Sequence, residues 1–451
     1  MATLNWIGKG QNPKLEPRIL IEDPDKSYGD KSSDNMLIHG DNLLALKALE
    51  QDYSGKIKCI YIDPPYNTGQ AFDHYDDGIE HSLWLSLMKE RFTILKNLLD
   101  DKGTFFCQLN DDEQAYGKVL LDEVFGRQNF LNQISVKMKQ TSGASGGGED
   151  KKLKKNIEYI LIYTKDLNSF VKFNDIYEEQ NLFELINEMR DSGKSWKYTR
   201  VLLDIGEREY FKEIIDGSNQ PIKIYKHKKV LIKSIKELME KENLSEEQCY
   251  YKYYDKIFRD TNAQSSIRTR VIDATENDSE FISIDYIPVS GKSKGVLTTL
   301  YYKGSKKDLI AWLRDVAVKR GSTLFKSEKI GTFWDGFPLN NLTKEGGVLF
   351  PNGKKPEALI KRILDLATTD GDFVLDSFLG SGTTCAVAHK MGRKYIGIEL
   401  GNHAITHCLP RLKAVSDGSD QGGISKIVNW KGGGGFKFYN LAPTLIVKVI
   451  Y

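Results

Sequence analysis

Short apolar runs alternate with longer amphipathic stretches over the first part of the chain. The runs at residues 35–41, 56–63 and 103–110 are rich in β-branched and aromatic side chains, which is typical of buried strands. Residues 43–51 and 82–99 carry apolar side chains at helical spacing instead. Because strands that alternate with helices build parallel sheets, this pattern predicts an α/β fold.

The same alternation returns near the end of the chain. Residues 373–376 and 394–399 are two further strand-like runs, and a glycine turn and a helix-like stretch separate them. The α/β pattern of the first part of the chain therefore returns here.

The middle of the chain has a different character. From residue 168 to residue 339 glycine turns become rare, Lys and Tyr become frequent, and helical patterns occur at 182–190, 207–215 and 228–241. We therefore predict a mostly helical insertion. The predicted divisions are an N-terminal arm, a first α/β half, the insertion, and a second α/β half with the C-terminal tail (1–34, 35–167, 168–339 and 340–451).

Composition informs the expected size, location and membrane association of the protein more than its function. A chain of 451 residues is long enough for two or three domains, and its formal charge of +2 neither requires nor excludes nucleic acid. The five cysteines form no Cys-x-x-Cys pair, so we expect no metal site, no disulfide framework and a cytoplasmic location. No apolar run reaches membrane-spanning length and the first residues lack a signal-peptide core, so we expect no membrane association.

The motif Asp63-Pro64-Pro65-Tyr66 follows the apolar run 59–62 directly. The prolines end the strand, because they cannot donate to a sheet ladder. Ligands bind at the carboxyl ends of strands in open α/β sheets. There, the Asp63 carboxylate and the Pro64 carbonyl can each accept one hydrogen of an exocyclic amine, and Tyr66 can stack on a flat base. The alternative is an ordinary strand exit in which the prolines act only as a turn.

A glycine turn follows the second apolar run. Gly380 and Gly382 lie between the run 373–376 and a helix-like stretch, an arrangement that lets backbone N–H groups approach a nucleotide-like cofactor. Glu399 ends the next strand at the spacing expected of a ribose-binding carboxylate. A dinucleotide would favour a third glycine where Ala386 stands, which weakens a NAD site without excluding it.

Together these motifs resemble those of the DNA amino-methyltransferases that use S-adenosylmethionine. The Asp-Pro-Pro-Tyr motif precedes the Phe-x-Gly-x-Gly motif at 378–382, which is the order of the permuted, beta-type group. Three further segments resemble parts of that family, namely residues 37–42, 84–91 and 350–357. Two others, residues 5–9 and 432–436, resemble modification subunits of type III restriction systems.

The resemblance implies a circularly permuted, Rossmann-like methyltransferase fold. Its two halves would form one doubly wound α/β sheet, in which the strand at 373–376 lies beside the strand before Asp63. It implies that the insertion is a target-recognition region and that the enzyme flips its base out of the duplex. The implied catalytic residues are Asp63, Pro64, Pro65 and Tyr66. The implied S-adenosylmethionine-binding residues are Asp41, Asp376, Phe378, Gly380, Gly382, Thr383, Glu399, Lys355 and Pro356. Relatives usually carry a His before Glu158, which this chain lacks, so no role is transferred to that position.

Adenine N6 is the favoured target, because family members that act on cytosine N4 more often carry Ser where this chain has Asp63. Cytosine, a non-catalytic DNA-binding module, and a methyltransferase of RNA or of protein amides are the alternatives. The implied partners are double-stranded DNA, a second copy of the chain and a separate restriction subunit.

The insertion interleaves basic and aromatic residues, which favours DNA binding over simple solvated helices. Its candidate DNA contacts are Lys226, Lys229, Arg268 and Arg270. The glycine-rich residues 143–148 and the lysines that follow them fit a linker or a lid over DNA equally well.

Overall fold

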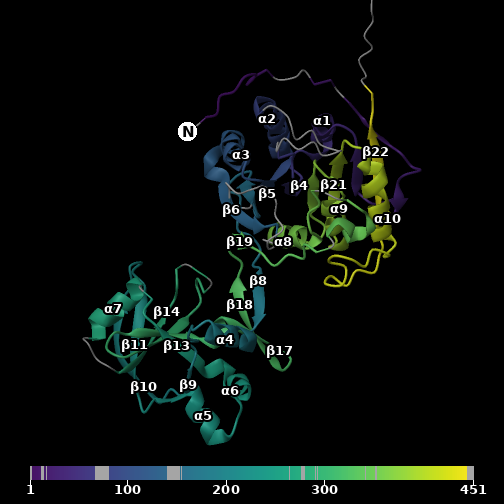
Figure 1. Cartoon of the computed structure of the whole chain (residues 1–451). Coiled ribbons are helices and arrows are strands. Elements are labelled where there is room, and N and C mark those ends of the chain that lie inside the picture. The colour runs from purple at the N-terminus through teal and green to yellow at the C-terminus, as the bar shows by residue number, and fades with distance from the viewer. Residues whose placement is uncertain are drawn as a thin grey trace, which may run out of the picture. The chain divides into compact units, whose positions relative to one another are not determined.

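The computed structural model describes residues 3–11, 15–16, 18–66, 81–139, 153, 155–263, 265–275, 280–289, 291, 293–340, 342–350 and 353–443. The chain forms two compact units (Figure 1). The first combines residues 1–176 with 331–451, and the second is 177–330. The second unit is therefore shorter than the predicted insertion. The glycine-rich residues 143–148, proposed as a linker or lid, lie outside the described residues.

The first unit is built on a mixed β-sheet, which has eleven strands among the described residues. The strands from β22 to β5 in the order below run parallel, whereas β1, β2 and β7 pair antiparallel with their neighbours. The order is β1 (Leu20–Glu22), β22 (Gly435–Leu441), β3 (Met36–His39), β21 (Lys394–Glu399), β20 (Phe373–Asp376), β4 (Ile57–Ile62), β5 (Leu99–Leu109), β7 (Ile157–Thr164), β6 (Phe130–Lys137) and β19 (Phe333–Trp334), with β2 (Tyr28–Gly29) beside β22.

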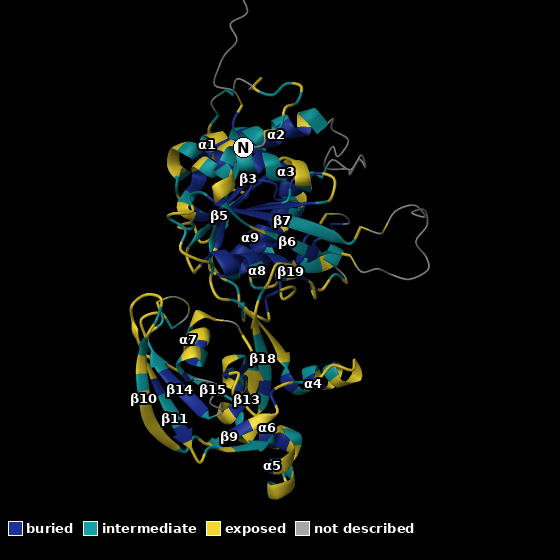
Figure 2. Ribbon diagram, turned by 90° about the vertical axis from the view of Figure 1, so that its left-hand side faces the viewer, coloured by how far each residue is buried: buried dark blue, intermediate teal, exposed yellow. Residues whose placement is uncertain are grey.

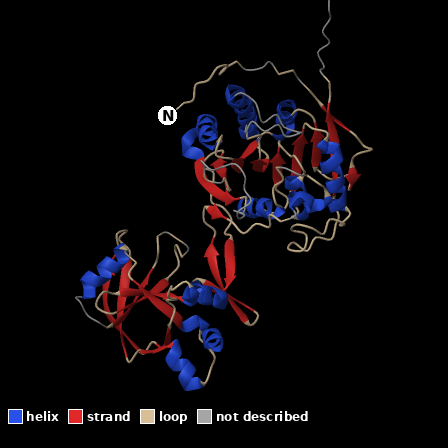
Figure 3. Ribbon diagram, viewed as in Figure 1, coloured by secondary structure: helices blue, strands red, loops and turns tan. Residues whose placement is uncertain are grey.

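Helices cover both faces of this sheet (Figure 3). One layer contains α1 (Asn42–Tyr53), α2 (His81–Leu98) and α3 (Gln114–Leu121), and the other contains α8 (Glu357–Ala367), α9 (Thr383–Lys390) and α10 (Leu409–Ser416). The sheet between them is the most buried layer (Figure 2). Shorter helical turns occur at Asp122–Gly126, Arg127–Asn129, Leu342–Gly347 and Ala404–Cys408. This is the doubly wound α/β architecture that the sequence predicts.

Strand β20 lies between β4 and β21, so segments from the two ends of the chain are direct neighbours. Val374 is in register with Cys59, and Asp376 is in register with Gly397. This confirms the predicted pairing of the strand before Asp63 with the strand at 373–376. Part of the predicted N-terminal arm belongs to the sheet, because β1 and β2 both pair with β22.

The second unit contains mostly strands, so the prediction of a mostly helical insertion is wrong. A sheet of eight described strands has the order β10 (Glu207–Ile215), β11 (Pro221–Lys228), β14 (Phe281–Tyr286), β15 (Thr298–Lys303), β16 (Asp308–Trp312), β13 (Ile257–Thr261), β9 (Arg200–Asp204) and β12 (Leu231–Ser234). A second sheet has the order β17 (Ala317–Arg320), β18 (Thr323–Lys329) and β8 (Tyr177–Asn181). The helices are α4 (Leu182–Asp191), α5 (Ile235–Glu242), α6 (Glu246–Lys252) and α7 (Ser266–Thr275), with short turns at Tyr254–Lys256 and Leu313–Asp315.

The errors have a common physical cause. The predicted helix at 182–190 is confirmed as α4, but the one at 207–215 is strand β10, and the one at 228–241 divides into β12 and α5. The apolar residues of 207–215 are spaced so that they suit a helix or an edge strand. Pairing with β11 decides for the strand, because pairing with a distant segment outweighs weak local preference.

Candidate active site

Four acidic residues of the sequence motifs meet at one edge of the first sheet. Asp63 follows β4, Asp376 ends β20, Glu399 ends β21, and Asp41 follows β3 at the start of α1. Because these four strands are parallel neighbours, their carboxyl ends lie together. The tertiary structure thus brings together carboxylates that are far apart in the sequence.

The Asp63 carboxylate is held by two other side chains. Its Oδ2 lies 2.7 Å from Nζ of Lys355, and its Oδ1 accepts a hydrogen bond from the Tyr66 hydroxyl. The Tyr66 hydroxyl also lies 2.9 Å from Oε2 of Glu158, and Lys355 Nζ lies 3.4 Å from that same oxygen. We refer to Asp63, Tyr66, Glu158 and Lys355 as the Asp63 cluster. Lys355 therefore contacts the carboxylate that is predicted to be catalytic, a contact that its predicted cofactor role did not include.

Buried side chains support this cluster from the neighbouring strands. Gln108 of β5 donates its amide to Glu158 Oε2 at 2.6 Å and accepts the Tyr61 hydroxyl at 2.7 Å. Trp84 of α2 donates its indole N–H to the Pro65 carbonyl at 2.8 Å. The Pro64 carbonyl has no hydrogen-bond donor among the described contacts, so it can accept one from a ligand.

Burial governs protonation in the Asp63 cluster. Burial raises the pKa of the Asp63 carboxyl, Lys355 opposes this effect, and Glu158 adds to it. Burial lowers the pKa of Lys355, but Asp63 and Glu158 outweigh burial, so that pKa lies above its ordinary value. Burial, Asp63 and Glu158 all raise the pKa of Tyr66. Lys355 is therefore charged and Tyr66 is a neutral phenol at physiological pH.

The glycine loop between β20 and α9 has the backbone conformation that the sequence motif predicts. Gly380 has a φ of +57° and Gly382 a φ of +81°, values that side-chain-bearing residues rarely adopt. A Cβ on Gly382 would lie 3.3 Å from Cα of Cys408. The loop is therefore closely packed on one side, and only glycine suits its path.

Asp376 shapes the start of this loop. Its Oδ1 accepts the Phe378 N–H at 2.9 Å, and its Oδ2 accepts the Thr384 hydroxyl at 2.6 Å. Burial raises the pKa of Asp376 to about 7, although these two donors oppose the shift. The carboxyl group is thus committed to the loop, while the Phe378 side chain is buried.

Glu399 is connected to the same loop. Its Oε2 accepts the Gly380 N–H at 2.7 Å, and its Oε1 accepts the Gly401 N–H at 2.8 Å and lies 3.2 Å from His403 Nε2. Burial raises the pKa of Glu399, but His403 and the backbone donors outweigh burial, so the carboxylate is ionised. The Gly380 N–H occupies one lone pair of Oε2, so the other lone pair of this oxygen can accept a hydroxyl group of a ligand.

A buried network of charges lies behind the glycine loop, and the sequence motifs did not reveal it. Arg411 donates to the Ser381 carbonyl at 3.1 Å, to the Thr383 hydroxyl at 2.8 Å and to Glu357 at 2.8 Å. Lys390 lies 2.9 Å from Glu357 and 2.8 Å from Asp420. We refer to Glu357, Lys390, Arg411 and Asp420 as the Arg411 cluster. The Thr383 hydroxyl therefore bonds to Arg411, and its predicted cofactor contact stays a prediction.

The remaining predicted cofactor residues lie at helix starts. Asp41 caps α1 by accepting the Leu44 N–H at 3.0 Å, and its Oδ2 lies 3.6 Å from Arg91. Pro356 precedes α8, where its fixed φ suits the start of a helix, and it is buried. Both residues lie near the carboxyl ends of the strands, and their contacts with a cofactor stay predictions.

The four candidate DNA contacts of the second unit differ in accessibility. Lys226 lies 3.1 Å from Glu280, and Lys229 lies 2.5 Å from Glu207 with its own side chain 77% exposed. Arg270 is exposed. Arg268 is buried and donates to the carbonyls of Asn262, Lys306 and Lys307 and to Asp308. The structure thus assigns Arg268 a structural role in place of the predicted DNA contact, because its donors are used within its own unit.

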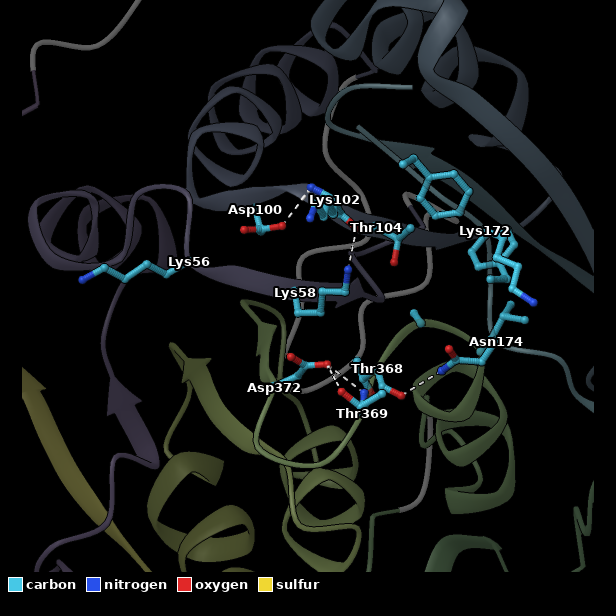
Figure 4. Close-up of a pocket in the computed structure, with 14 residues that line it drawn as sticks. Lys56, Lys58, Asp100, Lys102, Thr104, Lys172, Asn174, Thr368, Thr369 and Asp372 are labelled. Atoms are coloured by element: carbon cyan, nitrogen blue, oxygen red, sulfur yellow. Dashed lines mark hydrogen bonds between the residues drawn. The ribbon is translucent and has the colours of Figure 1, made fainter. Parts of the chain in front are cut away.

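A separate cavity of ≈ 380 Å³ lies at the opposite edge of the first sheet (Figure 4). Lys58 and Asp372 line it at the amino ends of β4 and β20, and five residue steps along the strand, about 17 Å, separate Lys58 from Asp63. Lys58 donates to the Lys102 carbonyl there at 2.7 Å. This cavity is therefore distinct from the candidate site.

No cluster of three or more side chains suitable for a metal ion occurs in the part of the chain that the structure describes. None of the helices in the described ranges is long and apolar enough to cross a bilayer. All five cysteines are buried free thiols.

Comparison with known proteins gives consistent matches. A family model described as DNA methylase matches residues 57–409. The HindVI Mod subunit of Haemophilus influenzae is 47% identical over 413 residues, which cover 91% of this chain and 54% of the relative. The Mod subunit of the type III restriction-modification enzyme EcoPI, from Escherichia phage P1, is 28% identical over 445 residues, which cover 88% and 62%. The solved structure of the cytosine-N4-specific PvuII DNA methyltransferase aligns with a TM-score of 0.40 and 12% identity, covering 89% of this chain and 95% of that chain. The chain spans about half the length of the HindVI subunit.

Proposed function

Because the chain belongs to the DNA methylase family, we propose that it transfers a methyl group from S-adenosylmethionine to the exocyclic N6 amine of adenine in DNA. The observation that carries the proposal is the position of Asp63, which follows β4, because β4 is the direct neighbour of β20 and β20 precedes the glycine loop. A role as the modification component of a restriction-modification system is supported by relatives named as Mod subunits.

The glycine loop and Glu399 fit the proposed cofactor. The loop needs glycine at 382, because a Cβ there would lie 3.3 Å from Cα of Cys408. The Oε2 atom of Glu399 can accept a ribose hydroxyl beside the Gly380 N–H. We propose that Gly380, Gly382 and Phe378 hold the methionine end, and that Asp41 accepts a hydrogen from the adenine. S-adenosylmethionine supplies an electrophilic methyl group on a sulfonium when bound.

Asp63 and Pro64 activate the target amine in this proposal. An exocyclic amine is a poor nucleophile, because its lone pair is delocalised into the ring. Two acceptors, the Asp63 carboxylate and the Pro64 carbonyl, favour a pyramidal nitrogen and stabilise the positive charge that develops on it. The base must leave the duplex to reach them, and the Tyr66 ring offers a face for stacking.

Methyl transfer from labelled S-adenosylmethionine to unmethylated genomic DNA tests the activity, and nucleoside analysis of the product identifies the base. The expected product is N6-methyladenine. Exclusive N4-methylcytosine would favour the alternative target, whereas no transfer by correctly folded protein would defeat the proposed activity and support a non-catalytic DNA-binding role.

We also propose that the second unit recognises the target sequence. Its β10 and β11 strands carry paired basic and aromatic side chains, with the Arg208 guanidinium 3.6 Å from the Tyr225 ring centre and Lys226 Nζ 4.5 Å from that of Phe211. Such pairs can contact phosphates and bases. Residues 177–330 should be exchanged for the matching segment of a relative with a different site. The chimera should methylate the donor's site, and a chimera that keeps the recipient's site would contradict the proposal.

Individual contacts can be tested with a matched pair of arginines. Arg270→Ala should weaken DNA binding and reduce its salt dependence, because the side chain is exposed. Arg268→Ala should instead lower the stability of the second unit, because its guanidinium satisfies three buried or partly buried carbonyls. Binding isotherms at several salt concentrations separate the two effects. Equal losses of DNA affinity in equally stable variants would contradict this distinction.

The proposed partners are double-stranded DNA, a second copy of the chain and a separate restriction subunit. The names of the relatives support the last of these, because a Mod subunit is one part of a larger enzyme. Analytical ultracentrifugation of the protein, alone and with a DNA duplex, tests the homodimer. A monomer at micromolar concentration in both samples would contradict it.

A further inference from the structure

Three oxygen atoms of the Asp63 cluster form two short contacts, but the Tyr66 hydroxyl supplies a proton for only one of them. The Tyr66 hydroxyl contacts both Asp63 Oδ1 and Glu158 Oε2, the latter at 2.9 Å. A phenol has one proton and can donate to only one of these acceptors. The other contact becomes a hydrogen bond only when one of the two carboxyl groups carries a proton.

The charge count of the cluster points the same way. Asp63 and Glu158 are two acids, and among the residues that the structure describes Lys355 is the one cation that contacts them, at 2.7 and 3.4 Å. The side chains of these three residues are only 18%, 17% and 7% exposed. One added proton would remove the excess negative charge and would turn both Tyr66 contacts into hydrogen bonds. The cluster is therefore built to accept one proton.

The proposed methyl transfer releases one proton. As the bond from nitrogen to the methyl carbon forms and the bond from carbon to sulfur breaks, the nitrogen acquires a positive charge and must lose a hydrogen. We propose that Glu158 is a positioning residue that completes a proton-sharing chain with Tyr66 and Asp63, and that this chain takes up the released proton. Asp63 receives the proton from the nitrogen, Tyr66 accepts it from Asp63 Oδ1, and Tyr66 passes its own proton to Glu158 Oε2.

The surroundings keep Glu158 in place for this role. Gln108 is fully buried and donates to Glu158 Oε2 at 2.6 Å, while Tyr61 donates to the Gln108 carbonyl oxygen. Burial, which raises the pKa of Asp63, favours proton uptake. Within the described ranges, the titratable or charged groups that face Asp63 are Lys355, Glu158, Tyr66, Asp376, Tyr61 and Cys107.

The inference rests on the proposed methyl transfer, and Glu158→Gln tests it with little change of shape. In single-turnover assays with saturating cofactor and DNA, the rate should fall about 10²-fold, as for loss of a positioned proton-transfer group. Cofactor affinity should stay within about twofold. Loss of the neighbouring negative charge lowers the pKa of Asp63, so the acid limb of the pH–rate profile should move to lower pH. Asp52→Asn, which neutralises an exposed carboxylate, should change neither the rate nor the profile.

Tyr66→Phe provides a second test, because it interrupts the chain and keeps both carboxyl groups. The double variant with Glu158→Gln should be no slower than the slower single variant, since both changes break one chain. Effects that multiply, or an unshifted acid limb in Glu158→Gln, would overturn the inference and leave Glu158 a structural residue. No methyl transfer by the wild type would instead defeat the proposed function.

A measurement on the unliganded protein does not depend on activity. Infrared titration with isotopically labelled carboxyl groups should show the neutral Asp63 carboxyl disappearing at a lower pH in Glu158→Gln than in wild type. Identical titration of the two proteins would overturn the shared proton.

Discussion

Two charged clusters lie near the same edge of the first sheet, and they differ in whether their acidic and basic side chains are equal in number. The Arg411 cluster contains two acids and two cations, and its side chains are between 0% and 3% exposed. The Asp63 cluster contains two acids and one cation, and its two carboxylates are 18% and 17% exposed. One cluster satisfies its own charges, whereas the other retains an excess negative charge where a ligand can reach it.

This difference in charge balance suggests a structural role for the Arg411 cluster and a chemical role for the Asp63 cluster. Desolvating four charges is tolerable only when each has a partner in good geometry, so the Arg411 cluster suits a support that holds the Ser381 carbonyl of the glycine loop. An unbalanced, partly accessible cluster is less stable alone, but it can bind a positive charge or a proton. The following variants test whether the two clusters have these separate roles.

The largest effect is expected for Asp63→Ala. The variant loses the acceptor of the target amine, and removal of one preorganised electrostatic group costs about 10²–10³-fold in rate. Cofactor affinity by calorimetry should stay within about threefold, because the glycine loop is untouched. Asp52→Ala, which removes an exposed carboxylate, serves as the control. Parallel loss of activity and cofactor affinity would contradict the assignment of Asp63 to the amine.

The Arg411 cluster should respond in stability. Arg411→Met leaves Glu357 with one cation fewer, and breaking a buried ion pair typically lowers the free energy of unfolding by about 3–5 kcal/mol. Urea denaturation measures this change. Cofactor affinity should also fall, because the Ser381 carbonyl loses its donor.

Lys355→Met is the matched variant in the Asp63 cluster. It should reduce the rate of methyl transfer, but it should lower the free energy of unfolding less than Arg411→Met does. The reason is that the side chains it leaves unpaired are partly exposed. If Lys355→Met destabilised the protein as much as Arg411→Met, the proposed contrast between the clusters would be lost.

Gly382→Val should weaken cofactor binding by about tenfold or more. The residue has a φ of +81°, and the added Cβ would lie 3.3 Å from Cα of Cys408, so the loop must move. Gly371→Val is a matched control, with a φ of +78° and no atom within 4 Å of its Cβ position. Both variants carry backbone strain, and only Gly382→Val should lose cofactor affinity in a titration. Equal affinities would place the cofactor elsewhere.

The last prediction concerns the pH dependence of stability. The pKa of Asp376 is raised from 3.8 to about 7, so the folded protein binds more protons than the unfolded chain between these values. Its contribution to the free energy of unfolding therefore decreases as the pH rises from about 4 to 7, by about 1.4 kcal/mol for each unit of pKa difference. Asp376→Asn should remove this decrease. Urea denaturation at pH 5 and pH 7.5 checks the prediction, and parallel pH dependence in both proteins would contradict it.

Local sequence was sufficient to predict several elements, including the two strands that precede the sequence motifs. The predicted strands before Asp63 and at 373–376 are β4 and β20, and the helix at 182–190 is α4. Buried apolar runs and glycine turns are short-range signals, so they survive without knowledge of the partner strand. Strand β10 shows the limit, because its partner β11 decided between two conformations that its own residues allow.

By itself, the sequence determined which residue types stand at the ends of the parallel strands, and hence Asp63, the glycine loop and Glu399. Only the tertiary structure decided their partners. Glu158 contacts Tyr66 across 92 positions of sequence, and Arg411 contacts the Ser381 carbonyl across 30. Neither residue belongs to a motif, because nothing local requires its side chain. Their roles come from close packing and from burial, which make a charge costly unless another segment of the chain supplies its counterpart.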